Sequence, residues 1–497
     1  MDPLRRNPHI YQINLMTWLR DLSSELGRRV TLETIPGDRW PALRELGMDL
    51  VWLMGMWERS PTSREKARRE PNLLEAGRNA LPDFEVEDLD GSPYAVHDYR
   101  PDPRFGSEEA LLAVKEACEA VGLRLILDFV PNHTACDHQW VLEKPEIYVH
   151  KETAEDPVDG FFRVQGQPYL VANGKDPYFP PWTDTAQLHY GRKETHQVMA
   201  RALLGLTRFC HGFRCDMAML VLRDIFRNTW GALVGDPETQ EEFWDLARRA
   251  FKAEGVSPLM IAEAYWGTDA RLRDLGFQFV YDKELYDLFS ARDIARLREL
   301  LARPAAEQEH QVRFLENHDE PRAMAFLGPG HIRCAMVLHA TLPGMRFWQE
   351  GQFEGYRIRV PVQLSRAPRE EADPDLLRFS HVLLRLVDHP VFHDGAWELC
   401  ETAGWHDNDS HRHLLAWSWR LGQERRWIVG NLSDQGAQGR VIPPSGWLPR
   451  ARALWLSDPL KGERFQRERA KTETHGLYVG LGPGEFHFFT VEGRIER

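Results

Sequence analysis

The sequence repeats one local pattern along most of its length: a helix, a glycine, a short apolar strand and a loop. In the clearest copy, a helix predicted for residues 107–122 leads into the apolar run 123–128. Ser107 is suited to cap this helix before two glutamates, and Gly122 can adopt the left-handed conformation that ends it. The run that follows is too short for a helix and too apolar for an exposed strand. It therefore predicts a parallel strand that is buried on both faces.

Seven more apolar runs fit the same unit, so that the chain has eight candidate strands. Eight strands that alternate with helices are what a closed (β/α)8 barrel requires, and such barrels carry their chemistry at the C-terminal ends of the strands. The predicted fold class is therefore α/β, with a TIM barrel as its main body. The other seven runs are residues 10–14, 50–53, 212–215, 259–262, 277–280, 312–315 and 345–348.

Two stretches interrupt the pattern. Residues 135–190 follow the third strand, are rich in proline, glycine and aromatic residues, and show no long helical period. After about residue 390, short alternating segments are separated by Gly, Asp, Asn and Pro, which is typical of an antiparallel β-domain. We therefore predict a catalytic barrel of residues 1–134 and 191–390, an inserted subdomain B of residues 135–190 and a C-terminal β-sandwich domain of residues 391–497.

Charge and composition argue against several classes of protein. The net charge of -13 and the lack of long basic runs argue against nucleic acid as a partner. No run of about 18 uncharged apolar residues is present, so we expect no membrane span. The N-terminal residues lack the apolar stretch of a signal peptide, and the six cysteines are scattered without paired spacing. These features predict a cytoplasmic protein with reduced thiols, and they give no indication of oligomeric state.

Acidic residues or histidines directly follow four of the predicted strands. An isolated acid at a strand end usually caps the strand or forms a surface ion pair, but four such segments in order favour one shared site. Cleavage of an acetal needs a proton donor for the leaving oxygen and a carboxylate that meets the positive charge at the sugar carbon. The pattern therefore predicts the cleavage or transfer of a sugar. The segments are Asp-Phe-Val-Pro-Asn-His at 128–133, Gly-Phe-Arg-Cys-Asp at 212–216, Ala-Glu-Ala at 262–264 and Glu-Asn-His-Asp at 316–319.

In order and strand position, these segments resemble the four short regions of the α-amylase family, glycoside hydrolase family 13. The resemblance covers the barrel, the insertion and the C-terminal domain. It implies a retaining mechanism on α-glucosidic bonds, in which a carboxylate attacks the sugar and a second one acts as acid and base. By this match Asp216 is the nucleophile, Glu263 is the general acid/base, and Asp319 binds sugar hydroxyls and stabilises the transition state.

Neighbouring residues take supporting roles. Arg214 lies two residues before Asp216 on the same strand face, so it can hold that carboxylate ionised. The resemblance implies that His133 and His318 hydrogen-bond the sugar in the reactive subsite. It also implies that Tyr94 stacks beneath this sugar and that Asp128 supports the site from below. We include these five residues among the substrate-binding candidates, although a purely structural role for Tyr94 and Asp128 is an equal alternative. Apolar neighbours of Glu263, namely Ala262, Ala264 and Trp266, are compatible with a dry pocket that raises its pKa.

The sequence departs from the family in three places. Met219 and Leu220 stand where many α-amylases carry a Lys-His pair, which predicts different and more apolar leaving-group subsites. Asn132 matches a common calcium ligand, but Gln187 replaces the expected aspartate, so a structural calcium is only one possibility and no other cofactor is expected. Ala95 stands where exo-acting glucosidases often carry the aspartate that holds a non-reducing end, which argues against a strict exo-glucosidase.

The leading hypothesis is a glycoside hydrolase of the α-amylase type, a retaining α-glycosidase that acts on maltooligosaccharides or α-glucans. One alternative is a transglycosylase or sugar isomerase that uses the same carboxylates, because transfer differs from hydrolysis only in what resolves the covalent intermediate. Another is a non-catalytic carbohydrate-binding protein on the same fold. A sugar-phosphate substrate also stays open, because arginines lie near the predicted barrel mouth.

Overall fold

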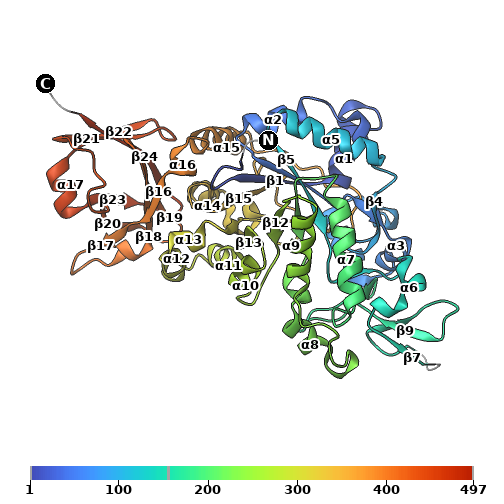
Figure 1. Ribbon diagram of the computed structural model, residues 1–497. Helices are drawn as coiled ribbons and strands as arrows, with labels where there is room; N and C mark the ends of the chain where they lie inside the picture. The colour runs from blue at the N-terminus through green and yellow to red at the C-terminus, as the bar shows by residue number, and fades with distance from the viewer. Residues whose placement is uncertain (1–2, 154–156, 495–497) are drawn as a thin grey trace.

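The computed structural model describes residues 3–153 and 157–494. Eight parallel strands close into a barrel in the order β1-β2-β5-β11-β12-β13-β14-β15, and β15 returns to pair with β1 (Figure 1). The predicted (β/α)8 barrel is therefore confirmed. Its strands are β1 (His9–Asn14), β2 (Leu50–Met54), β5 (Arg124–Phe129), β11 (Gly212–Cys215), β12 (Leu259–Ala262), β13 (Phe279–Tyr281), β14 (Gln311–Arg313) and β15 (Met345–Gln349).

Helices follow the strands and cover the outside of the barrel. At the start of α5 the Ser107 hydroxyl accepts a hydrogen bond from the backbone N–H of Ala110 at 3.2 Å, and beyond its end Gly122 has a φ of 81°. Both predicted end signals therefore act. The helices are α1 (Leu15–Leu26), α2 (Arg39–Glu45), α5 (Glu108–Ala120), α7 (Lys193–Leu206), α8 (Arg223–Trp230), α9 (Phe243–Ala253), α10 (Asp269–Asp274), α11 (Lys283–Ala291), α12 (Ile294–Leu301), α13 (Ala305–Gln308), α14 (Ala323–Ala340), α15 (Pro374–Val387) and α16 (Val391–Asp394).

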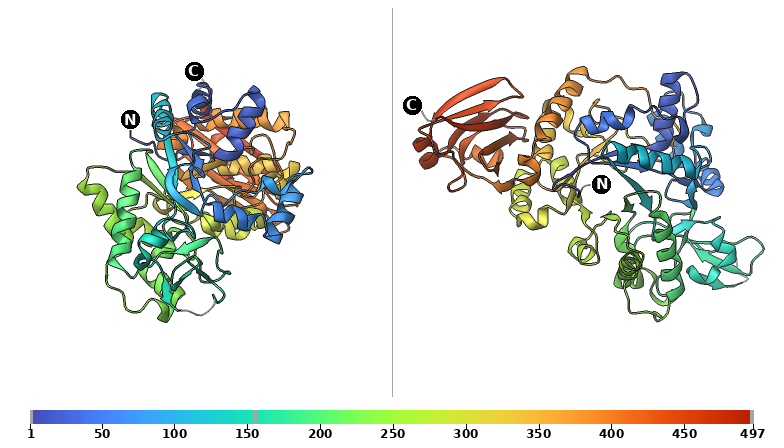
Figure 2. Two further views of the ribbon diagram at one scale, coloured as in Figure 1. Left: turned by 90° about the vertical axis from the view of Figure 1, so that its right-hand side faces the viewer. Right: turned by 45° about the horizontal axis from the view of Figure 1, so that its top comes forward.

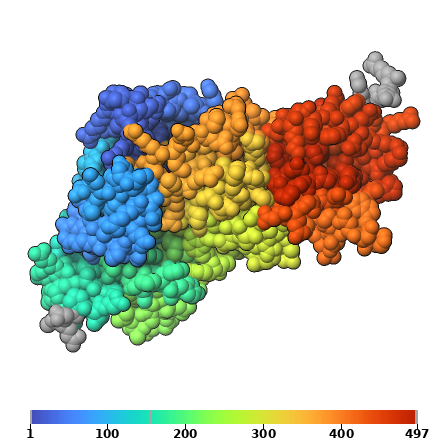
Figure 3. Space-filling view, turned by 180° about the vertical axis from the view of Figure 1, so that it is seen from behind, coloured from blue at the N-terminus to red at the C-terminus, as the bar shows by residue number. Residues whose placement is uncertain are grey.

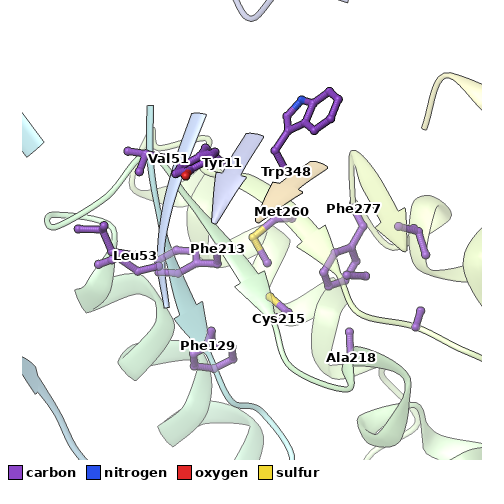
Figure 4. Packing of buried hydrophobic residues seen from close by; sticks show 14 of the residues in the cluster. Tyr11, Val51, Leu53, Phe129, Phe213, Cys215, Ala218, Met260, Phe277 and Trp348 are labelled. Carbon is purple, nitrogen blue, oxygen red and sulfur yellow. The ribbon is translucent and has the colours of Figure 1, made fainter. Parts of the chain in front are cut away.

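Side chains of the barrel strands alternate between two apolar layers. Phe129, Phe213 and Cys215 belong to the outer layer, which packs against the helices (Figure 4). Ile126, at an alternate position of β5, belongs to a separate cluster inside the barrel. Because successive strand residues point to opposite faces, Arg214 points into the barrel between two outward-facing neighbours. The outer layer thus fixes the direction of the polar side chains at the strand ends.

The sixth barrel strand begins two residues later than predicted. The apolar run places Phe277 in the strand, but β13 starts at Phe279. The Phe277 ring lies against Trp244 of α9, with the ring centroids 4.8 Å apart. Its apolar character therefore serves a contact with a helix and not with a neighbouring strand.

Two insertions leave the C-terminal ends of barrel strands. The one after β2 was not predicted, because its strands are short and carry charged residues. The other follows β5, in the region where the sequence predicts an inserted subdomain, and its first strand already begins at His133. The first contains the antiparallel pair β3 (Trp57–Arg59) and β4 (Val96–Pro101) with α3 (Pro61–Ala67) and α4 (Pro71–Ala80) between them. The second contains β6 (His133–Ala135), α6 (Trp140–Glu143), β7 (His150–Glu152), β8 (Phe161–Arg163), β9 (Tyr169–Ala172) and β10 (Thr185–Gln187).

The C-terminal region forms antiparallel sheets at the opposite end of the molecule from the second insertion (Figures 2 and 3). The indole N–H groups of Trp417 and Trp419 bond to Thr341 after α14, at 3.1 and 2.7 Å, so this domain is attached to the barrel. Six strands form one sheet in the order β16-β18-β19-β24-β21-β22, and three form another in the order β17-β20-β23. The elements are β16 (Ala396–Leu399), β17 (Glu401–Ala403), β18 (Leu414–Leu421), β19 (Glu424–Asn431), β20 (Ala437–Ile442), β21 (Ala453–Asp458), β22 (Glu463–Glu468), α17 (Arg469–His475), β23 (Leu477–Leu481) and β24 (Phe486–Arg494).

None of the helices in the described residues combines the length and the apolar character that crossing a bilayer requires.

Candidate active site

One buried arginine joins two carboxylates at the ends of neighbouring strands. In the β11–β12 pair, Cys215 lies opposite Ala262, so Asp216 and Glu263 both follow directly on paired residues. Arg214, which is only 1% exposed, places Nη1 2.7 Å from Asp216 Oδ1 and Nη2 2.7 Å from Glu263 Oε2. The strand register therefore brings the two carboxyl groups to opposite ends of one guanidinium group.

Glu263 has partners on both of its carboxylate oxygens. Besides Arg214, the backbone N–H of Met217 donates to Oε2 at 2.8 Å, which Met217 achieves in a left-handed conformation with a φ of 41°. The Tyr265 hydroxyl donates to Oε1 at 2.7 Å. Burial and the nearby charges of Asp216 and Asp319 together raise the pKa of Glu263 to about 7, even though Arg214 opposes the shift. A carboxyl group with that pKa can both donate and accept a proton near neutral pH.

Asp216 and Asp319 differ in their surroundings. Burial raises the pKa of Asp216, with Arg214 acting in the opposite direction. The Asp319 side chain is 49% exposed at the barrel mouth. Burial of its carboxyl group is outweighed by the interaction with His318 and by the charges of Arg214 and Arg359, which lower the pKa of Asp319 to about 2. Asp319 is therefore ionised at any pH at which the protein is expected to work.

His318 is held between three polar groups. The side-chain amide of Gln12 on β1 donates to its Nδ1 at 2.7 Å. Its Nε2 lies 3.0 Å from Asp319 Oδ2 and 2.8 Å from the Tyr94 hydroxyl, and the Tyr94 and His318 rings stack with centroids 5.5 Å apart. Because Gln12 donates to Nδ1, the ring proton sits on Nε2 and faces Asp319.

His133 and Asp128 are buried, and each is hydrogen-bonded to backbone nearby. His133 Nε2 donates to the carbonyl oxygen of Tyr94 at 3.2 Å, and burial lowers the pKa of His133 to about 4, so the ring is neutral. Asp128 is buried, and its Oδ2 accepts a hydrogen bond from the backbone N–H of Gly55 at 2.8 Å. This bond ties the loop after β2 to the end of β5. Asp128 Oδ1 has no hydrogen-bond partner among the described residues, so both roles of Asp128 stay predictions.

Around Asn132, a side-chain amide lies where the family resemblance implies calcium. Gln187 Nε2 donates to Asn132 O at 2.9 Å, to Asn132 Oδ1 at 3.0 Å and to Leu188 O at 3.0 Å. Calcium is bound by several oxygen atoms, usually with carboxylates among them. Here an N–H donor lies among the three oxygens, and Gln187 replaces the carboxylate. These residues do not fit a calcium ion at this position.

The leaving-group side differs from the expectation. Met219 and Leu220 lie in the short 3-10 helix Ala218–Val221 and are buried in the main core, so they do not line the mouth as apolar replacements for the Lys-His pair. An exposed aromatic residue, Trp266, lies on the loop that follows Glu263. Trp266 is 44% exposed with a φ of 61°, and its ring centroid is 5.1 Å from that of Tyr178, which is 70% exposed. Trp266 therefore does not seal the Glu263 pocket as expected.

Sequence reasoning missed three residues of this site. Tyr265 lies two positions after Glu263, and the same spacing that placed Arg214 beside Asp216 could have identified it. Gln12 is a polar residue in an otherwise apolar barrel strand, which is a weaker signal. Arg359 donates to the backbone oxygen of Asp319 at 2.7 Å from the loop that follows β15, and nothing in its local sequence indicates that contact.

Comparison with known proteins places the chain among carbohydrate-active enzymes. The family model of the alpha-amylase catalytic domain matches residues 37–357. A cyclomaltodextrinase from Geobacillus thermopakistaniensis is 25% identical over 418 residues, which are 80% of this chain and 65% of that protein. A trehalose synthase/amylase from Mycolicibacterium smegmatis is 24% identical over 379 residues, which are 68% of this chain and 59% of that protein. The chain thus spans about three fifths of the length of these curated relatives.

Solved structures show the same architecture. A maltogenic alpha-amylase from Thermotoga neapolitana superposes with a TM-score of 0.68 at 17% identity, covering 97% of this chain and 98% of that one. A trehalose-6-phosphate hydrolase from Bacillus licheniformis superposes with a TM-score of 0.66 at 14% identity, covering 99% and 100%. At these identities the likeness establishes a common fold.

Proposed function

This chain belongs to the α-amylase family of glycoside hydrolases, and we propose that it hydrolyses α-glucosidic bonds of maltooligosaccharides or α-glucans with retention of configuration. The observation that carries the proposal is the single guanidinium group of Arg214 bound to both Asp216 and Glu263. A retaining enzyme needs two carboxyl groups about 5–5.5 Å apart, one as nucleophile and one as acid and base. Two carboxylates that share one guanidinium lie close enough for these roles.

The environments of the two carboxyl groups support different roles for them. Glu263 Oε2 is paired with Arg214 and accepts from the Met217 N–H, whereas the one partner of Oε1 is the Tyr265 hydroxyl, which can also accept, so Oε1 is the oxygen suited to carry the proton. We propose that Glu263 gives this proton to the leaving oxygen while an Asp216 oxygen attacks the sugar carbon and forms a covalent ester. In the second half, Glu263 takes a proton from water, whose oxygen attacks the same carbon and releases Asp216.

The mouth of the barrel suggests how the sugar is held. Asp319 is ionised, half exposed and oriented by His318, so it can accept hydrogen bonds from sugar hydroxyls and face the positive charge of the transition state. The Tyr94 ring, stacked on His318, offers an aromatic face of the kind that packs against a sugar ring.

Transfer to a second sugar is the other candidate reaction. It is favoured by the exposed pair Trp266 and Tyr178 on the loops beside Glu263, since aromatic faces at that position could hold an acceptor sugar in place of water. The carboxylates would act in the same way in both reactions.

The product profile on maltoheptaose tests the proposal, with Asp216→Asn as the control. For a hydrolase we expect only shorter sugars from the unaltered protein and none from the variant. Products longer than maltoheptaose would show that the protein catalyses transfer and would overturn the proposal of hydrolysis. Equal products from both proteins would overturn the assignment of Asp216 as nucleophile.

We also propose that the protein needs no calcium at Asn132, because the Gln187 amide makes the contacts that an ion would make. A chelator should leave the melting temperature unchanged, and Gln187→Asp, which restores a carboxylate, should lower it in a way that calcium reverses. A fall in the melting temperature of the unaltered protein on chelation, restored by calcium, would contradict this.

A further inference from the structure

A second cavity lies behind the candidate active site, on the Nδ1 side of His318. It has a volume of about 390 Å³, and its wall is formed by the end of β1, by α1 and α2 and by the loop after β15. Among the described residues that line it are His318 and Gln12, but none of the proposed catalytic groups Asp216, Glu263 and Asp319. The cavity therefore shares one wall with the active site and is otherwise separate from it.

The wall carries more acidic than basic side chains. Asp21, Glu350 and Glu354 line the cavity, and within the described part of the chain none of them forms an ion pair. The two arginines of the wall have other partners. Arg39 is paired with Glu25 at 2.8 Å.

Arg322, the other arginine, is paired with Glu316 at 2.8 Å. Burial, together with the charges of Asp21 and Glu354, raises the pKa of Glu350 to about 8. Burial also raises the pKa of Asp21 to about 6 and that of Glu354. These shifts show that the protein holds the three carboxyl groups in an environment that disfavours their charge.

A second and independent feature is a set of buried polar atoms, mostly acceptors, that have no hydrogen-bond partner. The Gln12 side chain is 1% exposed, and its Oε1 has no hydrogen-bond partner among the described residues. The same holds for the buried atoms Asn14 Oδ1, Gln349 Oε1 and Glu354 Oε2, and all four residues line this one cavity. Two donors of the wall, Arg39 Nε and Arg322 Nε, also lack hydrogen-bond partners, so unpartnered oxygens outnumber unpartnered donors by four to two. Buried polar atoms are almost always satisfied in folded proteins, so this excess of acceptors calls for a ligand that brings donors.

We propose that this cavity binds a small organic cation with protonated amino groups. Such a ligand brings a positive charge that favours ionisation of these carboxyl groups and N–H donors for the unpartnered oxygens, and the rings of Tyr11, Trp18 and Tyr356 in the wall can face a cation. A single metal ion fits less well. In the described chain, the one group of three acidic or histidine side chains compact enough for an ion is Asp458, Glu463 and His487 in the C-terminal domain, so the carboxylates of the cavity are spread too widely.

Occupancy of the cavity would be felt at the proposed catalytic centre. Gln12 lines the cavity, its Oε1 has no partner among the described residues, and its Nε2 donates to His318 Nδ1 at 2.7 Å. A cation at Oε1 polarises the amide and strengthens this donation. It thereby fixes the His318 proton on the nitrogen that lies 3.0 Å from Asp319. This coupling rests on the proposed function, whereas binding itself does not.

Calorimetric titration with 1,4-diaminobutane tests the site, and 1,4-butanediol serves as the uncharged probe of the same length. We expect the diamine to bind and the diol not to bind. Glu350→Gln and Glu354→Gln together should lower the affinity for the diamine by about tenfold or more, because they remove charge-assisted hydrogen bonds. Glu75→Gln, which removes one charge from an exposed position on α4, should leave its affinity unchanged.

Two controls keep the result decisive. The titration is repeated on Asp216→Asn saturated with maltoheptaose, and unchanged diamine binding places the ligand outside the active site. If the double variant fails to fold, Asp21→Asn at the cavity rim replaces it, with a smaller loss of affinity in the same direction. Binding of the diol as tight as that of the diamine, survival of diamine binding in the variants, or displacement by maltoheptaose would each overturn the proposal. Absence of glycosidase activity with intact diamine binding would overturn only the proposed function.

Discussion

The two halves of the candidate site are built differently. Arg214, Asp216 and Glu263 lie at the ends of two paired strands, are buried, and are held by the strand register. Asp319 and Trp266 lie on loops at the mouth and are about half exposed. The strand half therefore has preorganised charges in a dry environment, where electrostatic interactions are strong, and the loop half meets solvent and the parts of the substrate that vary.

The largest effect is expected from Arg214→Met, which removes the positive charge from the strand half. Two buried carboxylates would then face each other without a cation, and loss of one partner from a buried ion pair typically costs about 3–5 kcal/mol. We expect the free energy of unfolding to fall by roughly that amount and kcat to fall by about 10³-fold or more. Denaturant unfolding and initial rates on maltoheptaose measure both. A stable, active variant would show that the strand half does not depend on this arginine.

The sequence was sufficient for the strand half and insufficient for much of the loop half, for a physical reason. Asp216 and Glu263 directly follow short apolar runs, and the closed barrel brings such strand ends together whatever the loops do. Arg359 reaches Asp319 from a loop beyond another strand, so only the tertiary path of the chain creates that contact. The first insertion is not predicted because its hairpin strands carry charged residues. The burial of Met219 is not predicted because the residue type alone does not say which way its side chain points.

The second effect concerns the pH dependence of stability in Glu263→Gln. The pKa of Glu263 rises from 4.5 to about 7 on folding, so the folded state loses stability as the pH rises from about 4.5 to 7 and bears the full penalty above 7. A glutamine avoids this penalty. We expect the variant to be more stable by about 3 kcal/mol at pH 8 and to show almost no gain at pH 4.

Asp319→Asn is the matched test in the loop half, and we expect its stability to change in the opposite direction, to a loss. The pKa of Asp319 is lowered on folding, so the ionised carboxylate contributes stability above about pH 4, which the variant loses. Because this side chain is half exposed, solvent screening makes the loss small. Melting curves of both variants at pH 4 and pH 8 test this contrast. If the melting temperature at pH 8 changed in the same direction in both variants, the contrast between the halves would be refuted.

A third and smaller effect is expected from Tyr265→Phe. Tyr265 connects the two halves, because its hydroxyl donates from the loop to Glu263 Oε1 at 2.7 Å. Without this donor we expect kcat to fall by about tenfold. A hydrogen bond to the charged carboxylate favours ionisation, so its loss should move the basic limb of the kcat profile, which lies near pH 7, to higher pH. A fall in kcat with an unmoved limb would reduce Tyr265 to a packing role.

The smallest effect is expected from Trp266→Ala on the exposed loop. The indole ring is 44% exposed and its ring contact is with Tyr178, so its removal should change the free energy of unfolding by less than about 0.5 kcal/mol. A sugar stacked on this ring would lose binding energy, which should raise KM for maltoheptaose severalfold while kcat for a short substrate stays the same. If transfer products exist, they should decrease relative to hydrolysis, because an acceptor sugar loses its platform and water does not. A variant with a lowered kcat on every substrate would instead place Trp266 with the strand half.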